Sequence, residues 1–150
     1  MAPGINSKMN EVQAALGLVQ LKYHEKNIEK RKTIAETYRK NLKDIKGISL
    51  LPEPEKTDSN FAYFPVFINE KEYGMSRDEL YEKLKQHGIF GRRYFYPLIS
   101  EFSMYKGLDS AKPDNLPVAE KIAKQVICLP IYPDLDSENV ERIGKIIIKN

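Results

Sequence analysis

The opening run of the chain, residues 4–18, most strongly limits what it can fold into. A short irregular segment with a glycine and an asparagine leads directly into a helix that is apolar on nearly every side. One seam of this helix is Met9, Val12, Leu16, Val19 and Tyr23, and the other side carries Ala14, Ala15, Leu18 and Leu21. Such a helix must be covered by protein on more than one face. Few residues precede it, so we expect the chain to be part of something larger.

The composition is that of an ordinary globular protein with nearly balanced charge. Hydrophobic residues make up 41% of the 150 residues, and 24 basic against 21 acidic residues give a net charge of +3. The sequence has no basic stripe interleaved with aromatic residues, as a nucleic-acid site would require. No apolar run approaches the roughly 20 residues of a membrane span. We therefore expect neither nucleic acid nor a membrane as a partner.

Cys128 is the only cysteine in the sequence, which excludes an internal disulfide and a cysteine-built zinc site. Its apolar neighbours Ile127 and Leu129 indicate that its side chain is a small buried hydrophobic group. No signal-peptide pattern is visible in the sequence. We expect a reducing, cytoplasmic location.

The residues from 9 to about 46 contain no proline and are predicted to form one long helix. In its second half the apolar residues recur on one face, as in a normal amphipathic helix. These inward residues are Ile28, Ala35, Tyr38, Leu42 and Ile45. Gly47 is expected to end the helix in the left-handed conformation. The helix is interpreted either as one long surface helix or as a helix whose first third is sandwiched against further protein.

Shorter helices follow, each with a recognisable start. Ser76 and Glu79 form a capping box that opens a helix ending at Gly88. A short helix is predicted to begin near Pro117, and a final one is predicted to be capped by Asp136 or Ser137.

Strands are predicted at residues 61–68, 89–95 and 125–129, which are rich in aromatic and β-branched side chains. Pro65 suggests that the first of these strands lacks a partner on one edge at that point. Strands that alternate with helices, without a glycine-rich phosphate loop, predict a small α/β domain built in layers.

Neither histidine has the neighbours that catalysis or metal binding requires. His24 lies in a charged helical stretch and His87 directly precedes Gly88. Cysteines or paired carboxylates at metal-ligand spacing are missing around both. We interpret both as surface residues and predict no catalytic side chain and no metal site in this chain.

The segment from Gly4 to Lys8 combines a permissive backbone, the Asn6 amide and the Lys8 cation just before a helix. Such a group can bind a phosphate through hydrogen bonds and charge. The alternative is an ordinary lead-in to a helix.

A second segment places Arg92 and Arg93 beside three aromatic residues, Tyr94, Phe95 and Tyr96. Two guanidinium groups next to aromatic rings could hold a phosphorylated, ring-bearing ligand by forked hydrogen bonds and stacking. Strand alternation would put Arg92, Tyr94 and Tyr96 on one face and Arg93 and Phe95 on the other. A structural role, with the aromatic rings packed under the arginines, explains the same pattern equally well.

Three longer motifs occur in a fixed order and cover almost the whole chain. They are Gly4-x-Asn6-x-Lys8-Met9-Asn10-Glu11-x-Gln13-Ala14-Ala15-Leu16-Gly17-Leu18, then Gly88-Ile89 with Arg92-Arg93-Tyr94-Phe95-Tyr96-Pro97-Leu98, then Leu116-Pro117-Val118-Ala119-Glu120 with Cys128-Leu129-Pro130-Ile131-Tyr132-Pro133-x-Leu135. In this order they resemble the DegT/DnrJ/StrS-type nucleotide-sugar aminotransferases. Within that family the resemblance is strongest to enzymes that make dTDP-4-amino-4,6-dideoxyglucose.

The resemblance implies a fold-type-I enzyme that depends on pyridoxal phosphate (PLP). Residues 1–25 would be the end of the large domain or linker, with the apolar interface helix. Residues 26–150 would be the C-terminal small α/β domain. The family's cofactor-bearing lysine, in a Ser-x-His-x-x-Lys type segment, has no counterpart in this sequence. The fragment itself is therefore expected to lack transaminase activity and covalently bound PLP.

The resemblance also assigns roles to individual residues. Asn6 and Lys8 would reach the cofactor phosphate in the neighbouring subunit of a homodimer. Arg92, Arg93, Tyr94 and Tyr96 would line the substrate site. Many members have arginine at the Lys8 position, and lysine loses the planar fork that binds a phosphate at two points.

Two functions are compatible with these observations. The first is a part of an aminotransferase that moves an amino group, expected to come from glutamate, onto a nucleotide-linked keto sugar for surface polysaccharide. The second is a non-catalytic protein-interaction module that binds a partner through its apolar N-terminal helix.

Overall fold

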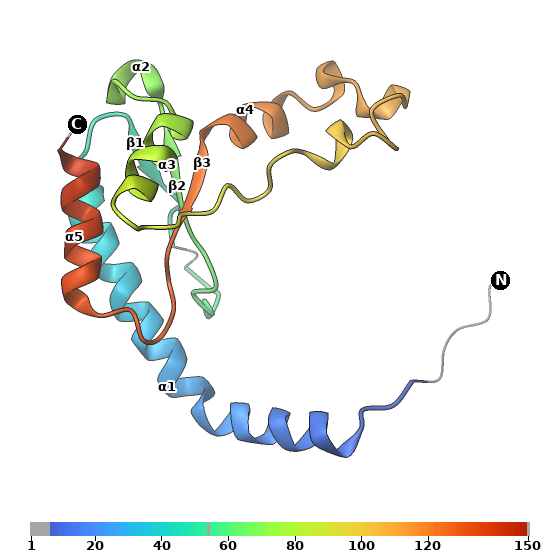
Figure 1. Ribbon diagram of the computed structural model, residues 1–150, viewed down its shortest axis with the longest axis vertical. Helices are drawn as coiled ribbons and strands as arrows, with labels where there is room; N and C mark the ends of the chain where they lie inside the picture. The colour runs from blue at the N-terminus through green and yellow to red at the C-terminus, as the bar shows by residue number, and fades with distance from the viewer. Residues whose placement is uncertain (1–6, 54, 150) are drawn as a thin grey trace.

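A computed structural model describes residues 7–53 and 55–149, which form a small antiparallel sheet with helices packed against it (Figure 1). In this part of the chain, β1 (Ile48–Leu50), β2 (Phe64–Ile68) and β3 (Val126–Leu129) form one sheet in the order β1-β2-β3. Both pairs of strands are antiparallel. The expected small domain of helices and strands is confirmed.

The long helix α1 (Glu11–Leu42) begins with a closed capping box. The Asn10 side chain accepts a hydrogen bond from the Gln13 amide at 2.9 Å, and the Gln13 side chain accepts one from the Asn10 amide at 3.1 Å. These bonds satisfy two of the amide groups that a helix start leaves without partners. At the other end α1 stops at Leu42, four residues before the predicted end. Gly47 has the expected positive φ of 78°, but it lies in the turn that leads to β1.

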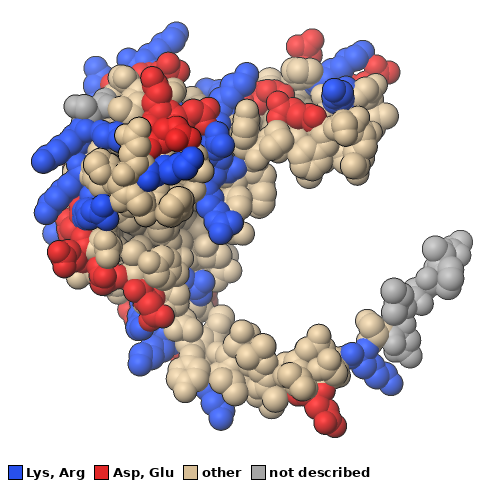
Figure 2. Space-filling view, viewed as in Figure 1, with Lys and Arg blue, Asp and Glu red and all other residues tan. Residues whose placement is uncertain are grey.

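The two halves of α1 lie in different surroundings. In the second half the side chains of Ile34, Ala35, Tyr38 and Leu42 are buried, and this half packs beside α5 (Ser137–Ile148). The first half extends away from the sheet (Figure 1), and Figure 2 shows it largely free of charged side chains. Its large apolar side chains are exposed, for example Val12 at 78% and Leu21 at 68%. The apolar start of this helix is therefore not covered by the described residues. The domain boundary at residue 25 stays a prediction, since α1 runs through it without a break.

The core lies between the second half of α1, the sheet, α3 (Arg77–Gln86) and α5. Alternate residues of β2 point into this core, and its other residues are half-buried. β1 ends opposite Val66, so the neighbouring Pro65 faces Cys128 of β3 alone, as its missing amide hydrogen requires. Cys128 is buried, as predicted, and burial raises the pKa of its thiol.

The other predicted elements are confirmed in part. The capping box of Ser76 and Glu79 opens α3, Asp136 caps α5, and α4 (Pro117–Gln125) begins at its proline. The short helix α2 (Glu70–Tyr73) and strand β1 were not predicted. Three short 3-10 turns, η1 (Ile99–Glu101), η2 (Asp109–Ala111) and η3 (Pro113–Asn115), precede α4 on an arm that projects from the sheet (Figure 1).

The strand predicted at residues 89–95 is wrong. In that stretch Arg92 forms an isolated antiparallel bridge with Cys128, and the chain then turns. Gly91 lies so close to β3 that an added Cβ would be 3.0 Å from the Ile127 side chain. The segment therefore touches the edge of β3 at one point instead of pairing along it.

None of the helices formed by residues 7–53 and 55–149 has the length and apolarity needed to cross a membrane. Within the same residues, no group of three or more His, Cys, Asp or Glu side chains is arranged to hold a metal ion.

Replacing Gly47 with alanine is expected to destabilise the fold by more than about 2 kcal/mol, because left-handed strain and a steric clash act together. An added Cβ would lie 2.3 Å from the backbone nitrogen of Tyr73. Gly88 is the matched control, since it has a similar φ of 74° but nothing within 4 Å of an added Cβ. Gly88→Ala should cost about 1 kcal/mol. Urea denaturation followed by circular dichroism measures the free energy of unfolding of both variants. Equal decreases would show that the contact with Tyr73 does not matter.

Candidate functional site

The candidate site is built around the segment from Arg92 to Tyr96. This segment touches β3 at the bridge between Arg92 and Cys128 and then turns away from it. Two backbone hydrogen bonds fix Arg92 there, from its amide to the Cys128 carbonyl at 2.9 Å and from the Cys128 amide to its own carbonyl at 2.7 Å. The backbone of Arg92 is therefore held while its side chain is exposed.

The Arg92 side chain lies over the ring of Tyr94, with its guanidinium carbon 5.6 Å from the ring centre. The Tyr63 ring contacts the same Tyr94 ring edge-on at 5.2 Å. These residues line a cleft of about 370 Å³ together with Phe90 and Tyr132. Among the described residues that line this cleft, Arg92 is the charged one. A cleft with one guanidinium and several aromatic rings suits a ligand that has both an anionic group and a flat ring.

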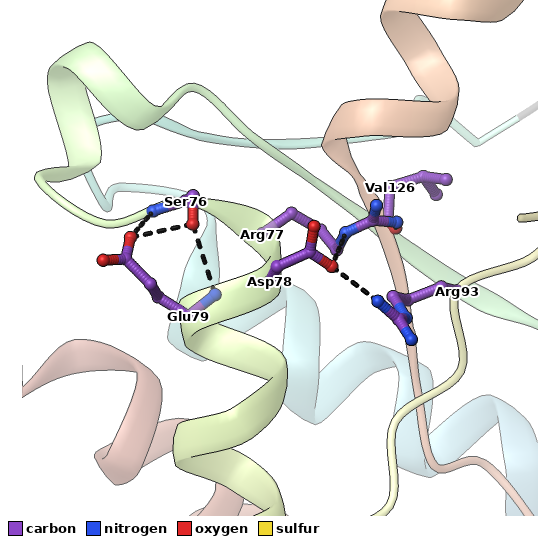
Figure 3. A network of polar contacts seen from close by, with 6 residues as sticks. All are labelled: Ser76, Arg77, Asp78, Glu79, Arg93 and Val126. Atoms are coloured by element: carbon purple, nitrogen blue, oxygen red, sulfur yellow. Dashed lines mark hydrogen bonds and ion pairs between the residues drawn. The ribbon is translucent and has the colours of Figure 1, made fainter.

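Arg93 has a different environment, which is drawn in Figure 3. One of its terminal nitrogens donates to Asp78 Oδ1 at 2.8 Å, and its guanidinium lies 4.5 Å from the Tyr81 ring and 5.3 Å from the Tyr96 ring. The hydrogen bond to Asp78 raises the pKa of Arg93. Arg93 is thus already paired, whereas no ion pair of Arg92 occurs in the described part of the chain.

The predicted alternation of faces along this segment is wrong. Tyr96 was expected beside Arg92 and Tyr94, but its ring contacts Arg93 and Arg77 instead. The reason is that the chain turns at Tyr94 and Phe95, so the period of a strand does not apply. The structure brings Arg92 and Tyr94 together at the cleft and separates them from the pair formed by Arg93 and Tyr96.

Arg77 lies behind Arg93 and was not recognised in the sequence as part of the site. Its side chain is 1% exposed, with Nε in an ion pair 2.9 Å from Asp78 Oδ1 and a terminal nitrogen donating to the Val126 carbonyl at 3.1 Å. The contact between Nε and Asp78 is an ion pair and not a hydrogen bond, because the N–H group does not point at the carboxylate oxygen. One feature of the sequence could have drawn attention to Arg77. It is a cation in the first turn of a helix, where a positive charge is unfavourable because it opposes the helix dipole. An arginine placed there against that preference indicates a specific partner elsewhere.

The Asp78 carboxylate is shared by two arginines. Desolvation raises the pKa of this carboxyl group, but the hydrogen bond from Arg93 and the charge of Arg77 outweigh it, so that the pKa lies below its usual value. Asp78 is also in the first turn of α3, where a negative charge is favourable.

Of the two candidate cofactor residues, Asn6 lies outside the described residues. Lys8 is exposed in the extended stretch that precedes α1, at the end of α1 that is far from the sheet (Figure 1). The structure therefore does not bring Lys8 together with Arg92 within one chain.

A larger cleft of about 550 Å³ lies between α1 and the loop that follows β1. Its charged lining residues are of both signs, and Arg39 among them already binds Glu53 at 2.8 Å and the Leu51 carbonyl at 2.8 Å. Lys32 also lines this cleft, but the carboxylates of Glu29, Glu53 and Asp58 line it too, which makes it less suited than the smaller cleft to an anionic ligand.

The fold is that of a small α+β domain that places an exposed arginine and aromatic rings at the edge of a sheet. Residues 1–148 match the DegT/DnrJ/EryC1/StrS aminotransferase family, and the chain belongs to that family. The expectation drawn from the three motifs is confirmed.

Individual relatives match nearly the whole chain. A dTDP-4-amino-4,6-dideoxy-D-glucose transaminase of Escherichia coli is 52% identical over 147 residues, which is 98% of this chain and 39% of the relative. The structure of S. venezuelae DesV in complex with a ketimine intermediate superposes with a TM-score of 0.87 at 28% sequence identity, over 99% of this chain and 38% of that chain. A structure described as that of a putative sugar aminotransferase, Spr1654 of Streptococcus pneumoniae in its PLP form, superposes with a TM-score of 0.82 at 25% sequence identity. The match covers 94% of this chain and 35% of that chain. The chain spans less than two fifths of the length of each.

The contribution of Asp78 to stability is expected to depend on pH. Because the folded protein holds the pKa of this carboxyl below the unfolded value of about 3.9, its contribution is complete above that value and is lost as pH falls through the folded pKa. Asp78→Asn should lower the free energy of unfolding by about 0.5–1 kcal/mol at pH 7, and the difference from wild type should shrink below about pH 4.

Urea denaturation at a series of pH values measures this difference. Asp109→Asn is the matched control, since Asp109 pairs with Lys112 at 2.7 Å on an open surface, with its side chain 93% exposed. Its effect should be smaller at pH 7. A loss for Asp78→Asn that stays constant down to pH 2 would contradict the assignment of the ion pair.

Proposed function

We propose that this chain forms the C-terminal part of a PLP-dependent aminotransferase that acts on a nucleotide-linked keto-deoxysugar. The 52% identity with a dTDP-4-amino-4,6-dideoxy-D-glucose transaminase, along 98% of the chain, is the observation that carries this proposal. The substrate would be a dTDP-4-keto-6-deoxy sugar and the amino donor glutamate. The reaction would take place in the cytoplasm and would supply amino sugars for surface polysaccharide. A non-catalytic interaction module finds no support among these relatives.

The exposed Arg92 guanidinium is the group in this chain best suited to the substrate. A nucleotide sugar carries an anionic diphosphate between a flat base and a sugar ring, and the cleft offers one cation among the rings of Tyr63, Tyr94 and Tyr132. Arg92 would bind the diphosphate, and the aromatic side chains would exclude water from it. Arg93 and Tyr96, expected in the sequence to bind substrate, are proposed to support the site, because they already contact Asp78 and Arg77.

Of the two residues expected to contact the cofactor phosphate, Lys8 is described, and its side chain is exposed. The start of α1 is not a free phosphate cradle. The amides of Asn10, Gln13 and Ala14 are already hydrogen-bonded, and Glu11 adds a negative charge. Lys8 would therefore attract the phosphate by charge, with Asn6 beside it in sequence. Its distance from the Arg92 cleft supports the proposal that it acts in the site of a second subunit of a homodimer.

PLP, when bound, supplies the electron sink through which an amino group is exchanged. This sequence has no lysine in the family's cofactor-bearing context, so we propose that these 150 residues alone do not catalyse transamination. Their role is to position the nucleotide sugar through Arg92 and to hold the cofactor phosphate through Asn6 and Lys8.

In the complete enzyme, Arg92→Ala is expected to raise the Michaelis constant for the nucleotide sugar at least about tenfold. Loss of one charge-assisted contact to a phosphate costs about 1.5–3 kcal/mol. The visible absorption of bound PLP should not change, because Arg92 is not proposed to touch the cofactor. Steady-state kinetics and an absorption spectrum measure the two effects. Lys22→Ala, on the exposed first half of α1, is the control, and an unchanged Michaelis constant for Arg92→Ala would remove Arg92 from the substrate site.

Lys8→Ala is expected to weaken PLP binding by about three- to tenfold, since one exposed cation near a dianionic phosphate is lost. The effect should diminish at high salt because the contact is exposed to solvent. Equilibrium dialysis of the complete enzyme at low and high ionic strength measures it. Lys8→Arg should bind PLP at least as tightly as wild type, since the guanidinium fork binds phosphate at two points. Equal PLP affinity in all three proteins would contradict the assignment.

A further inference from the structure

Asp78 connects the start of α3 to the segment that carries Arg92. One oxygen of its carboxylate lies 2.9 Å from Arg77 Nε and 2.8 Å from a terminal nitrogen of Arg93 (Figure 3). The two arginines come from parts of the chain that are 16 residues apart in sequence, and this carboxylate is the group that both share.

The Arg77 end of this connection is rigid. Its guanidinium is buried, donates to the Val126 carbonyl at the first residue of β3 and lies 5.0 Å from the Tyr96 ring. A buried guanidinium with these contacts cannot move without leaving a charge unpaired, which is costly. Asp78 is therefore held in place by the core of the domain.

The Arg93 end is only partly buried, with its side chain 34% exposed, and Asp78 is 58% exposed. An ion pair in water contributes little to overall stability. Without the carboxylate, however, two guanidinium groups would approach the same Tyr96 ring with no negative charge between them, and they would repel each other. The pair thus decides the conformation of the Arg93–Tyr96 stretch more than it decides whether the domain folds.

We propose that Asp78 is a positioning residue for substrate binding: by holding Arg93, it keeps the neighbouring Arg92 directed into the cleft formed with Tyr63 and Tyr94. This inference rests on the proposed function of that cleft. Arg92 has its backbone fixed on one side by Cys128, and Arg93 is the next fixed point along the chain. Release of the second point removes the restraint on the chain directly before Tyr94, on whose ring the Arg92 guanidinium lies. Asp78 acts on the substrate without contacting it.

The experiment compares Asp78→Asn, Arg93→Gln and the double variant in the complete enzyme. Each single substitution should raise the Michaelis constant for the nucleotide sugar about three- to tenfold while kcat stays within about twofold. The double variant should be no worse than the more affected single one, because both remove the same connection. The Michaelis constant for the amino donor should stay unchanged.

Three outcomes would overturn the proposal. Arg93 would be a direct substrate contact if Arg93→Gln raised the Michaelis constant while Asp78→Asn did not. Additive effects in the double variant would mean that the residues act separately. A fall in kcat and thermal stability with no change in the Michaelis constant would make the pair purely structural. If Asp78→Asn does not fold, Arg93→Lys tests the proposal instead. Lysine keeps a positive charge opposite Asp78 and should restore most of the substrate affinity lost in Arg93→Gln.

Glu82→Gln is the matched control on the same helix, because Glu82 forms an exposed pair with Lys85 at 3.7 Å and does not line the cleft. It should leave both kinetic constants unchanged. Arg92→Ala separates this proposal from the proposed function. If Arg92→Ala has no effect, the substrate site itself is misplaced. If Arg92→Ala weakens binding and Asp78→Asn does not, the positioning role alone fails.

Discussion

The contact between the second half of α1 and the sheet is the interaction on which the rest of the domain depends. Tyr38 is completely buried, its ring lies 5.1 Å from that of Phe64 in β2, and its hydroxyl donates to the Pro130 carbonyl just beyond β3 at 3.0 Å. One side chain thus joins the helix, the central strand and the exit of the third strand. Burial raises the pKa of its hydroxyl, so this donor stays protonated throughout the physiological range. The loop after β3, which forms one wall of the cleft, is placed by this contact.

Two further buried polar side chains of the core, those of Tyr73 and Arg77, are tied to backbone carbonyls of other elements. Tyr73 donates to the Ile147 carbonyl at 2.6 Å, which ties α2 to the end of α5, and burial raises its pKa to about 12. Arg77 carries a full charge and is held by a hydrogen bond from a terminal nitrogen to the Val126 carbonyl and by an ion pair with Asp78, although its Nε donates no hydrogen bond. These bonds specify which elements lie together, while the apolar side chains around them supply most of the stabilisation.

The helices could be predicted from the sequence because their ends are determined locally. Ser76 and Asp136 accept hydrogen bonds from amides three residues along the chain, so the signal and the structure lie in the same few residues. Strands depend on partners that are distant in sequence. β1 was missed because it is three residues long and is defined by its pairing with β2. Residues 89–95 have the composition of a strand, but no neighbour pairs with them beyond Arg92 in the described chain. The two arginines were found from their pattern, whereas their different roles follow from Asp78, which the sequence marked as part of a helix start.

The bridge between Arg92 and Cys128 has a consequence for how this family could diversify. The bridge uses backbone atoms alone, so it can form with almost any residue at position 92. Position 92 can therefore be varied without loss of the fold, whereas a change at position 77 or 93 removes an ion pair of Asp78. Tolerance to substitution and the proposed contact with the ligand thus fall on the same residue, so that one substitution there would alter ligand preference and leave the fold intact.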